Sequence, residues 1–139
     1  MWKRFGLRYC RVGKLRGRIV IPIREEGRLV GWQARTTGDD IPKYLSMPGF
    51  RITDYLFNED GIFGEEVFLV EGVFDVFALP TRAAALFGAK ISDAQVLRIR
   101  DRFSASHRVW ILMDGGGAGR KAAEEIFHRL IVPCPKTGI

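Results

Sequence analysis

Long apolar runs are absent from this sequence of 139 residues. No stretch approaches the ~20 apolar residues that a membrane-spanning helix needs. The opening residues, MWKRFGLRYC, lack the apolar core of a secretory signal. We therefore expect a protein that is neither embedded in a membrane nor exported, and that works in the cytoplasm.

Cysteine and histidine are also scarce, with two residues of each type. Cys10 and Cys134 lie far apart, and the imidazoles are His107 and His128, so the sequence lacks the clustered ligands of a zinc site. Since no secretory signal is evident, the two thiols are best interpreted as free cysteines in a reducing compartment.

Two common nucleotide-binding motifs are missing as well. The glycine-rich stretch Gly115–Gly119 is followed by Arg120-Lys121-Ala122, so the hydroxyl residue that completes a P-loop is absent. A dinucleotide-binding G-x-G-x-x-G motif would need glycine where Arg120 stands. The stretch is instead a glycine-rich turn before a helix, which a triphosphate can approach closely. Arg120 and Lys121 directly follow this turn, where we expect them to neutralise phosphate charge.

The composition is that of a globular protein, with 47% hydrophobic and 27% charged residues, and the charge is unevenly distributed. From Met1 to Lys43 there are eleven Lys and Arg residues against four acidic ones, a net charge of +7. The remainder has eleven against twelve, a net charge of −1. This asymmetry favours a polyanionic partner, nucleic acid above all. The alternative is a solvated basic face without a partner.

Two segments share one pattern, in which a short apolar run ends in a carboxylate followed by glycine. In Val67–Leu79 the carboxylate is Glu71, and in Val109–Gly119 it is Asp114. Each run predicts a buried strand, and helical spacing follows each turn. The alternation predicts a parallel sheet with Glu71 and Asp114 at its carboxyl edge, where they suit a hard cation such as Mg²⁺. Alternatively, each carboxylate caps the helix that follows it.

Further elements are predicted on both sides of these segments. Two β-rich runs, Arg18–Ile23 and Leu29–Ala34, surround a turn with Gly27 and predict a hairpin. The S-x-x-Q form that starts at Ser92 predicts a capped helix over 93–103. We also expect strands at 83–87 and 130–132. The predicted organisation is a basic β-rich subdomain, residues 1–60, followed by an α/β domain, residues 61–139.

The carboxylate segments, LVEGVFDVFAL and ILMDGGGAGRKAAEEI, resemble the TOPRIM domain, a metal-binding catalytic module of bacterial-type primases, type IA and type II topoisomerases and some nucleases. That family has Glu-Gly after one strand and Asp-x-Asp after a later one. Glu71 falls on its glutamate and Asp114 on its first aspartate, whereas Gly116 stands at the second. Other segments resemble primases, phage primases in particular: GRIVIPI, LVGWQAR, KYLSMP, YLFN and FGAKISDAQVL. The resemblance extends from about Gly17 to Arg129.

The resemblance implies a Rossmann-like TOPRIM sheet flanked by helices and a DNA primase activity. The reaction would be template-directed synthesis of short RNA primers on single-stranded DNA from ribonucleoside triphosphates. Its setting would be the cytoplasm of a bacterial or phage-infected cell, with a replicative helicase as a further partner. The site residues it implies are Glu71 and Asp114 for catalysis, Glu71, Asp114 and Asp75 for Mg²⁺ or Mn²⁺, and Arg18, Arg35, Lys43, Arg120 and Lys121 for nucleic acid or nucleotide.

Two of these assignments leave alternatives open. Asp75 either binds the metal or orients a basic neighbour. Gly116 removes one anionic ligand, which weakens Mg²⁺ binding, so the chain could be a catalytically weakened TOPRIM nucleic-acid-binding module or a fragment. A piece of a TOPRIM nuclease or topoisomerase would share the metal site. It fits less well, because the primase-like segments are present and no tyrosine is singled out for strand cleavage.

Overall fold

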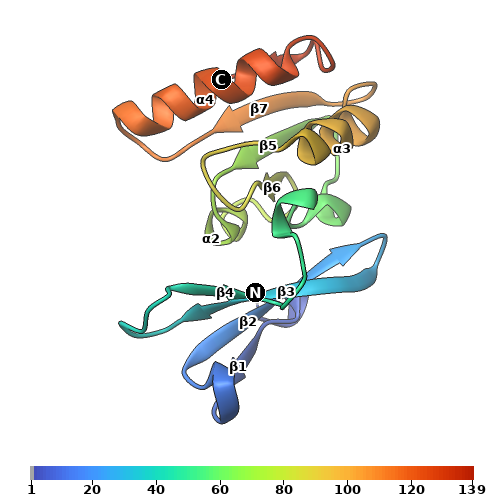
Figure 1. The fold of residues 1–139 in the computed structure, drawn as a ribbon. Helices are drawn as coiled ribbons and strands as arrows, with labels where there is room; N and C mark the ends of the chain where they lie inside the picture. The colour runs from blue at the N-terminus through green and yellow to red at the C-terminus, as the bar shows by residue number, and fades with distance from the viewer. Residues whose placement is uncertain (1) are drawn as a thin grey trace. The chain divides into compact units, whose positions relative to one another are not determined.

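The computed structural model describes residues 2–139, and the chain divides into two compact units, Met1–Ile52 and Thr53–Ile139. The first unit is built on antiparallel strands and the second combines strands with helices (Figure 1). Within residues 2–139, no helix has the length and apolar character needed to cross a bilayer.

The first unit is a four-stranded antiparallel sheet with the order β1-β2-β3-β4. Its long central strands, β2 and β3, pair from Arg18↔Thr36 to Glu25↔Arg28, which confirms the predicted hairpin. The elements of this unit are α1 (Trp2–Phe5), β1 (Arg8–Cys10), η1 (Gly13–Leu15), β2 (Arg18–Glu25), β3 (Arg28–Thr36) and β4 (Tyr44–Ser46).

Local chemistry explains the turn and the irregularity of this hairpin. The turn residues Glu26 and Gly27 have φ angles of +50° and +76°, the left-handed conformation that matches the twist of the flanking strands. Pro22 lies beyond Val20, the last residue of β2 that pairs with β1, and the register shifts just after Ile23. Proline is therefore placed where β2 has a single neighbour, as its missing N–H requires.

The second unit is a parallel sheet with the order β6-β5-β7-β8, flanked by helices. This confirms the predicted α/β fold, because strands that alternate with helices pair in parallel. The elements are η2 (Ile52–Asp54), which spans the sequence boundary between the units, η3 (Glu59–Gly61), β5 (Glu66–Val70), α2 (Val73–Val76), β6 (Ala83–Ala85), α3 (Asp93–Phe103), β7 (Arg108–Leu112), α4 (Gly117–Leu130) and β8 (Thr137–Gly138).

One core holds this sheet and its long helices together. Alternate residues of β5 and β7 are buried on one face, and the apolar sides of α3 and α4 pack with them, because side chains two apart in a strand share a face. The buried residues are Val67, Leu69, Val109 and Ile111 from the strands, and Ile99, Phe103, Ala123, Ile126 and Leu130 from the helices. This packing fixes where β5 and β7 end.

Two sequence predictions about element bounds met different outcomes. The helix over 93–103 is confirmed, with the Ser92 hydroxyl accepting from the Gln95 N–H at 3.0 Å. The strand expected at 130–132 is wrong, because Leu130 is the last residue of α4. The helical spacing Ala122, Ile126, Leu130 continues the buried stripe to that point, and β8 supplies the last strand instead.

Residues 53–60, which we expected in the N-terminal subdomain, make their contacts within the second unit. Phe57 bridges to Ala85 through two backbone hydrogen bonds of 3.0 and 3.1 Å. Arg98 of α3 donates to the Asp54 carbonyl at 2.6 Å and to the Glu59 carboxylate at 2.8 Å. These bonds place the division after Ile52.

Gln95 of α3 is the most heavily bonded buried amide of the second unit, and its loss has a predictable cost. Its Nε2 donates to the carbonyls of Tyr55 and Leu86, each at 2.9 Å, and its Oε1 accepts from the Ser92 N–H at 3.0 Å. Gln95→Leu removes the donor to both carbonyls and the acceptor of the Ser92 N–H, so we expect the free energy of unfolding to fall by about 1–3 kcal/mol.

Chemical denaturation measures this loss against a control on the same helix. Leu97 is exposed, so Leu97→Ala should change the free energy of unfolding by no more than about 0.5 kcal/mol. Equal midpoints for the two variants would mean that the amide of Gln95 does not hold the segment around Tyr55.

Candidate functional site

The two carboxylates singled out in the sequence lie at the same edge of the parallel sheet. β5 and β7 are neighbours, and their last residues, Val70 and Leu112, are partners in the register. Glu71 follows Val70 directly, and Asp114 is two residues beyond Leu112. The prediction that both carboxylates follow the carboxyl ends of parallel strands is therefore confirmed, and the two strands they follow are hydrogen-bonded neighbours.

The backbone around Glu71 is fixed by the loop that follows β6. The Glu71 carbonyl accepts from the Gly88 N–H at 2.9 Å, and the Val70 carbonyl accepts from the Leu86 N–H at 3.0 Å. The Glu71 side chain is half-buried. These bonds fix the backbone of Glu71. A side chain on a fixed backbone has a defined position, which a binding or catalytic group needs.

Asp75 turns back onto the same segment. Its Oδ2 accepts from the Gly72 N–H at 2.8 Å, and it lies at the third position of α2, where a carboxylate stabilises the start of a helix. This bond orients the turn that directly follows Glu71. The bond is to a backbone N–H and not to a basic side chain, so orienting a basic neighbour and binding the metal both stay predictions for Asp75.

Asp114 is exposed at the start of the glycine-rich turn that leads into α4. Gly116 has a φ of +101°, and Gly119 is buried. A Cβ at Gly119 would lie 1.7 Å from the Asp114 carbonyl oxygen, so α4 approaches the aspartate backbone as closely as glycine alone allows. Asp114 is therefore held by direct backbone contact with the first turn of α4.

A hollow of about 640 Å³ adjoins this turn. Asp114 and Arg120 line it together with the turn glycines and the apolar side chains of Ile111 and Ile139. Lys121, predicted to act beside Arg120, instead lies 4.0 Å from Glu125, one turn further along α4. The structure thus brings Arg120 to the aspartate and gives Lys121 an acidic neighbour on the helix surface.

The donor chemistry of this edge suits magnesium shared with a substrate. Glu71 and Asp114 offer carboxylate oxygens, and Mg²⁺ is commonly held by one or two carboxylates together with substrate phosphates. Within residues 2–139 no group of three or more His, Cys, Asp or Glu side chains forms a metal cage. Two carboxylates would leave the remaining coordination positions of Mg²⁺ to phosphate and water.

The predicted basic residues of the first unit have separate roles in the structure. Arg18 is 5% exposed, and its guanidinium donates to the carbonyls of Pro42 and Lys43 at 2.8 and 3.2 Å. It therefore holds the loop that carries Lys43. Arg35 and Lys43 line one hollow of about 630 Å³ together with Asp39 and Asp40. Arg35 and Lys43 thus line the same hollow, whereas Arg18 holds the backbone that carries Lys43.

Neither cysteine contributes chemistry to these groups. Both Cys10 and Cys134 are free thiols. Burial raises the pKa of the Cys134 thiol, against a smaller lowering by Arg100, so the reactive thiolate is disfavoured.

Sequence reasoning missed a second group of charged side chains, at the opposite edge of the parallel sheet. Arg108 begins β7, whereas Arg82 and Lys136 directly precede β6 and β8. They line a pocket of about 410 Å³. The available signal was a cation directly before two of the apolar runs, Arg82 before Ala83–Ala85 and Arg108 before Val109–Leu112, and these become neighbours of Lys136 only when the strands are known to be parallel.

Comparison with known proteins identifies relatives for most of the chain. A DNA primase of Synechococcus elongatus is 36% identical over 124 residues, covering 80% of this chain and 18% of the relative. A DNA primase of Thermotoga maritima is 34% identical over 134 residues, covering 86% and 23%. No protein-family model matches the chain. The chain thus spans about a fifth of the length of these curated relatives.

Solved structures show the same fold. The zinc-binding and RNA polymerase domains of the Aquifex aeolicus primase align with a TM-score of 0.71 at 29% identity, over 86% of this chain and 32% of that one. The catalytic domain of the DnaG primase bound to single-stranded DNA aligns at 0.69 and 27%, over 94% and 51%. The primase fragment of the bacteriophage T7 primase-helicase protein aligns at 0.76 over 99% and 57%, and at 20% identity it supports the fold alone.

Proposed function

Because the chain belongs to the family of bacterial DNA primases and has the fold of their catalytic core, we propose that it forms the nucleotidyl-transfer core of a primase. The single observation that carries the proposal is the register of β5 and β7, which brings Glu71 and Asp114 to one sheet edge. Open α/β sheets bind their ligands at this edge. The proposed setting is the cytoplasm of a bacterial or phage-infected cell, with single-stranded DNA as template and a replicative helicase as partner.

The proposed reaction joins ribonucleotides. The 3′ oxygen of the growing primer attacks the α-phosphorus of a ribonucleoside triphosphate, a new P–O bond forms, and the bond to pyrophosphate breaks. Glu71, on its fixed backbone, accepts the proton of the 3′ hydroxyl. Arg120 and the start of α4 stabilise the negative charge of the leaving pyrophosphate.

Asp114, with Glu71, would hold Mg²⁺ or Mn²⁺ in this site. When bound, the metal supplies positive charge that polarises the phosphoryl group and stabilises the leaving oxygen. Asp75 keeps the turn after Glu71 in place through its bond to Gly72. The chain's own contribution is therefore two carboxylates with fixed backbones, Glu71 held by the loop after β6 and Asp114 by the first turn of α4.

We assign the template to the first unit, where the excess positive charge of the sequence lies. Arg35 and Lys43 share one hollow, and Arg18 holds the Lys43 loop through backbone carbonyls. Phosphate contacts of this kind position a strand without reading its sequence. Asp39 and Asp40 in the same hollow limit how closely a phosphate approaches.

Incorporation of labelled ribonucleotides on single-stranded DNA, with Mg²⁺ or Mn²⁺, tests the proposal directly. Short RNA products that require both template and metal support a working primase core. Intact binding of single-stranded DNA with no product under any of these conditions would instead support the second candidate, a nucleic-acid-binding module that has lost synthesis. That candidate rests on the resemblance to the TOPRIM family, which places Gly116 at the position of the second aspartate.

Gly116→Asp is therefore expected to raise the affinity of the site for Mg²⁺. A Cβ at Gly116 meets nothing within 4 Å, but the φ of +101° is strained for any other residue. We expect a loss of about 1–3 kcal/mol in the free energy of unfolding. The Mg²⁺ concentration for half-maximal synthesis should fall about tenfold, because affinity rises with the number of charged oxygens.

A magnesium titration of synthesis, run beside thermal unfolding, separates these two effects. Gly27→Asp is the control, since Gly27 also has a positive φ, +76°, and open space around its Cβ. It adds the same charge in the first unit, whereas Gly116 belongs to the second unit. If both variants shift the magnesium midpoint equally, the added carboxylate is acting through net charge, and position 116 is not a ligand position.

A further inference from the structure

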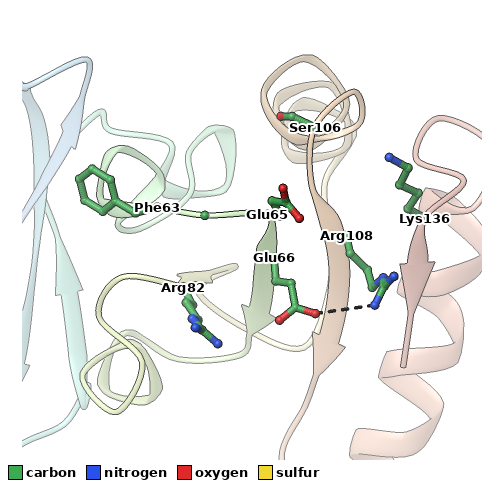
Figure 2. Close-up of a pocket in the computed structure, with 8 residues that line it drawn as sticks. Phe63, Glu65, Glu66, Arg82, Ser106, Arg108 and Lys136 are labelled. Carbon is green, nitrogen blue, oxygen red and sulfur yellow. Dashed lines mark ion pairs between the residues drawn. The ribbon is translucent and has the colours of Figure 1, made fainter.

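The amino edge of the parallel sheet carries a pocket of about 410 Å³ that the proposed chemistry does not use. Figure 2 shows its side chains extending from Phe63 at one end to Lys136 at the other, across the starts of the strands. Three cations line this edge, each at or directly before the start of a different strand. They are Arg82 before β6, Arg108 at the start of β7 and Lys136 before β8.

The cations differ in how far acidic neighbours neutralise them. Arg108 lies 3.9 Å from the Glu66 carboxylate, which also accepts from the Trp110 indole at 3.1 Å. Arg82 and Lys136 are exposed, and neither side chain has an ion pair or hydrogen bond to any of residues 2–139. Two cations are therefore available to a ligand, while Glu66 is already paired.

The spacing of these cations suits a chain of phosphates better than a single anion. β6 and β8 are separated by β5 and β7, and three strand spacings amount to ~14 Å. Phe63 stands at the end of this row with 66% of its surface exposed. Cations along a line with an exposed aromatic ring are the combination by which proteins bind a single nucleic-acid strand.

We propose that the pocket at the amino edge of the sheet, formed by Arg82, Arg108, Lys136 and Phe63, is a second binding site for single-stranded nucleic acid. Arg82 and Lys136 contact backbone phosphates, and Phe63 stacks on a base. Glu65, exposed in the same pocket, opposes the strand by charge repulsion. The site lies at the opposite edge from Glu71 and Asp114, so it holds the strand outside the place of synthesis.

The choice of single-stranded nucleic acid as ligand rests on the proposed function. The test measures binding alone and does not require primer synthesis. Fluorescence anisotropy of a labelled single-stranded oligodeoxynucleotide, without metal or nucleoside triphosphate, measures affinity over a range of salt concentrations. Arg82→Ala and Lys136→Ala should each lower the slope of log affinity against log salt by about 0.7, the share of one phosphate contact on a single strand. Phe63→Ala should weaken binding about fivefold or more, and Glu65→Gln should strengthen it.

Lys90→Ala is the matched control, because Lys90 is exposed in the same unit and follows β6 instead of preceding a strand. It removes the same charge and should leave the salt slope unchanged. Slopes that fall equally for Lys90→Ala, Arg82→Ala and Lys136→Ala would overturn the proposal and assign the effect to net charge. Unchanged slopes for Arg82→Ala and Lys136→Ala would overturn it as well. Neither result would bear on synthesis, which is measured separately.

Discussion

Glu71→Gln should lower primer synthesis by about 10²–10⁴-fold while leaving the fold and the binding of single-stranded DNA intact. The range is that of a positioned general base, and the amide keeps the size of the side chain while losing its charge and its capacity to accept a proton. The Glu71 backbone bond to Gly88 does not involve the side chain, so the loop should keep its place. Labelled ribonucleotide incorporation on single-stranded DNA measures the loss.

Glu124→Gln provides the comparison for charge and chemistry. Glu124 is exposed on α4, in the same unit, and its replacement removes the same charge away from the sheet edge. Its synthesis should stay within about twofold of the unaltered chain. If Glu71→Gln also stays within that range, Glu71 neither accepts the proton nor holds the metal, and the proposed mechanism fails at its central residue.

The parts of this structure that sequence predicted are those whose signal is local. The alternation of apolar runs with helical spacing gave the parallel sheet, and the S-x-x-Q pattern at Ser92 gave the start of α3 at Asp93. Parallel strands end at a common edge by geometry. Knowing that Glu71 and Asp114 each follow a strand was therefore enough to predict that they share an edge.

The parts that sequence could not give depend on partners distant in the chain. Arg18 was expected to bind nucleic acid or nucleotide from the resemblance to primases, whereas in the structure its guanidinium donates to carbonyls 24 and 25 residues away. Residues 53–60 looked like the end of a basic subdomain, yet Phe57 pairs with Ala85. Likewise, Leu130 could extend a helix or begin a strand, and burial against the sheet decides between them.

Gly119→Ala should disrupt both the stability of the second unit and the position of Asp114. A Cβ at residue 119 would lie 1.7 Å from the Asp114 carbonyl oxygen and 2.8 Å from its carbonyl carbon, and backbone cannot move aside as a flexible side chain can. We expect the free energy of unfolding to fall by about 3 kcal/mol or more, at the upper end of the cost of overpacking. Chemical denaturation of the variant measures the fall.

Gly117→Ala is the control that replaces a glycine of the same helix with alanine without creating a steric clash. Gly117 is the first residue of α4, and a Cβ there meets nothing within 4 Å. Alanine at this exposed helical position should raise the free energy of unfolding by about 0.4–1 kcal/mol, because it restricts the unfolded chain. Opposite signs two residues apart in one helix would show that the close approach of α4 to Asp114 is the cause. A Gly119→Ala variant as stable as the unaltered chain would mean that the turn relaxes freely, and that Asp114 is not held by α4.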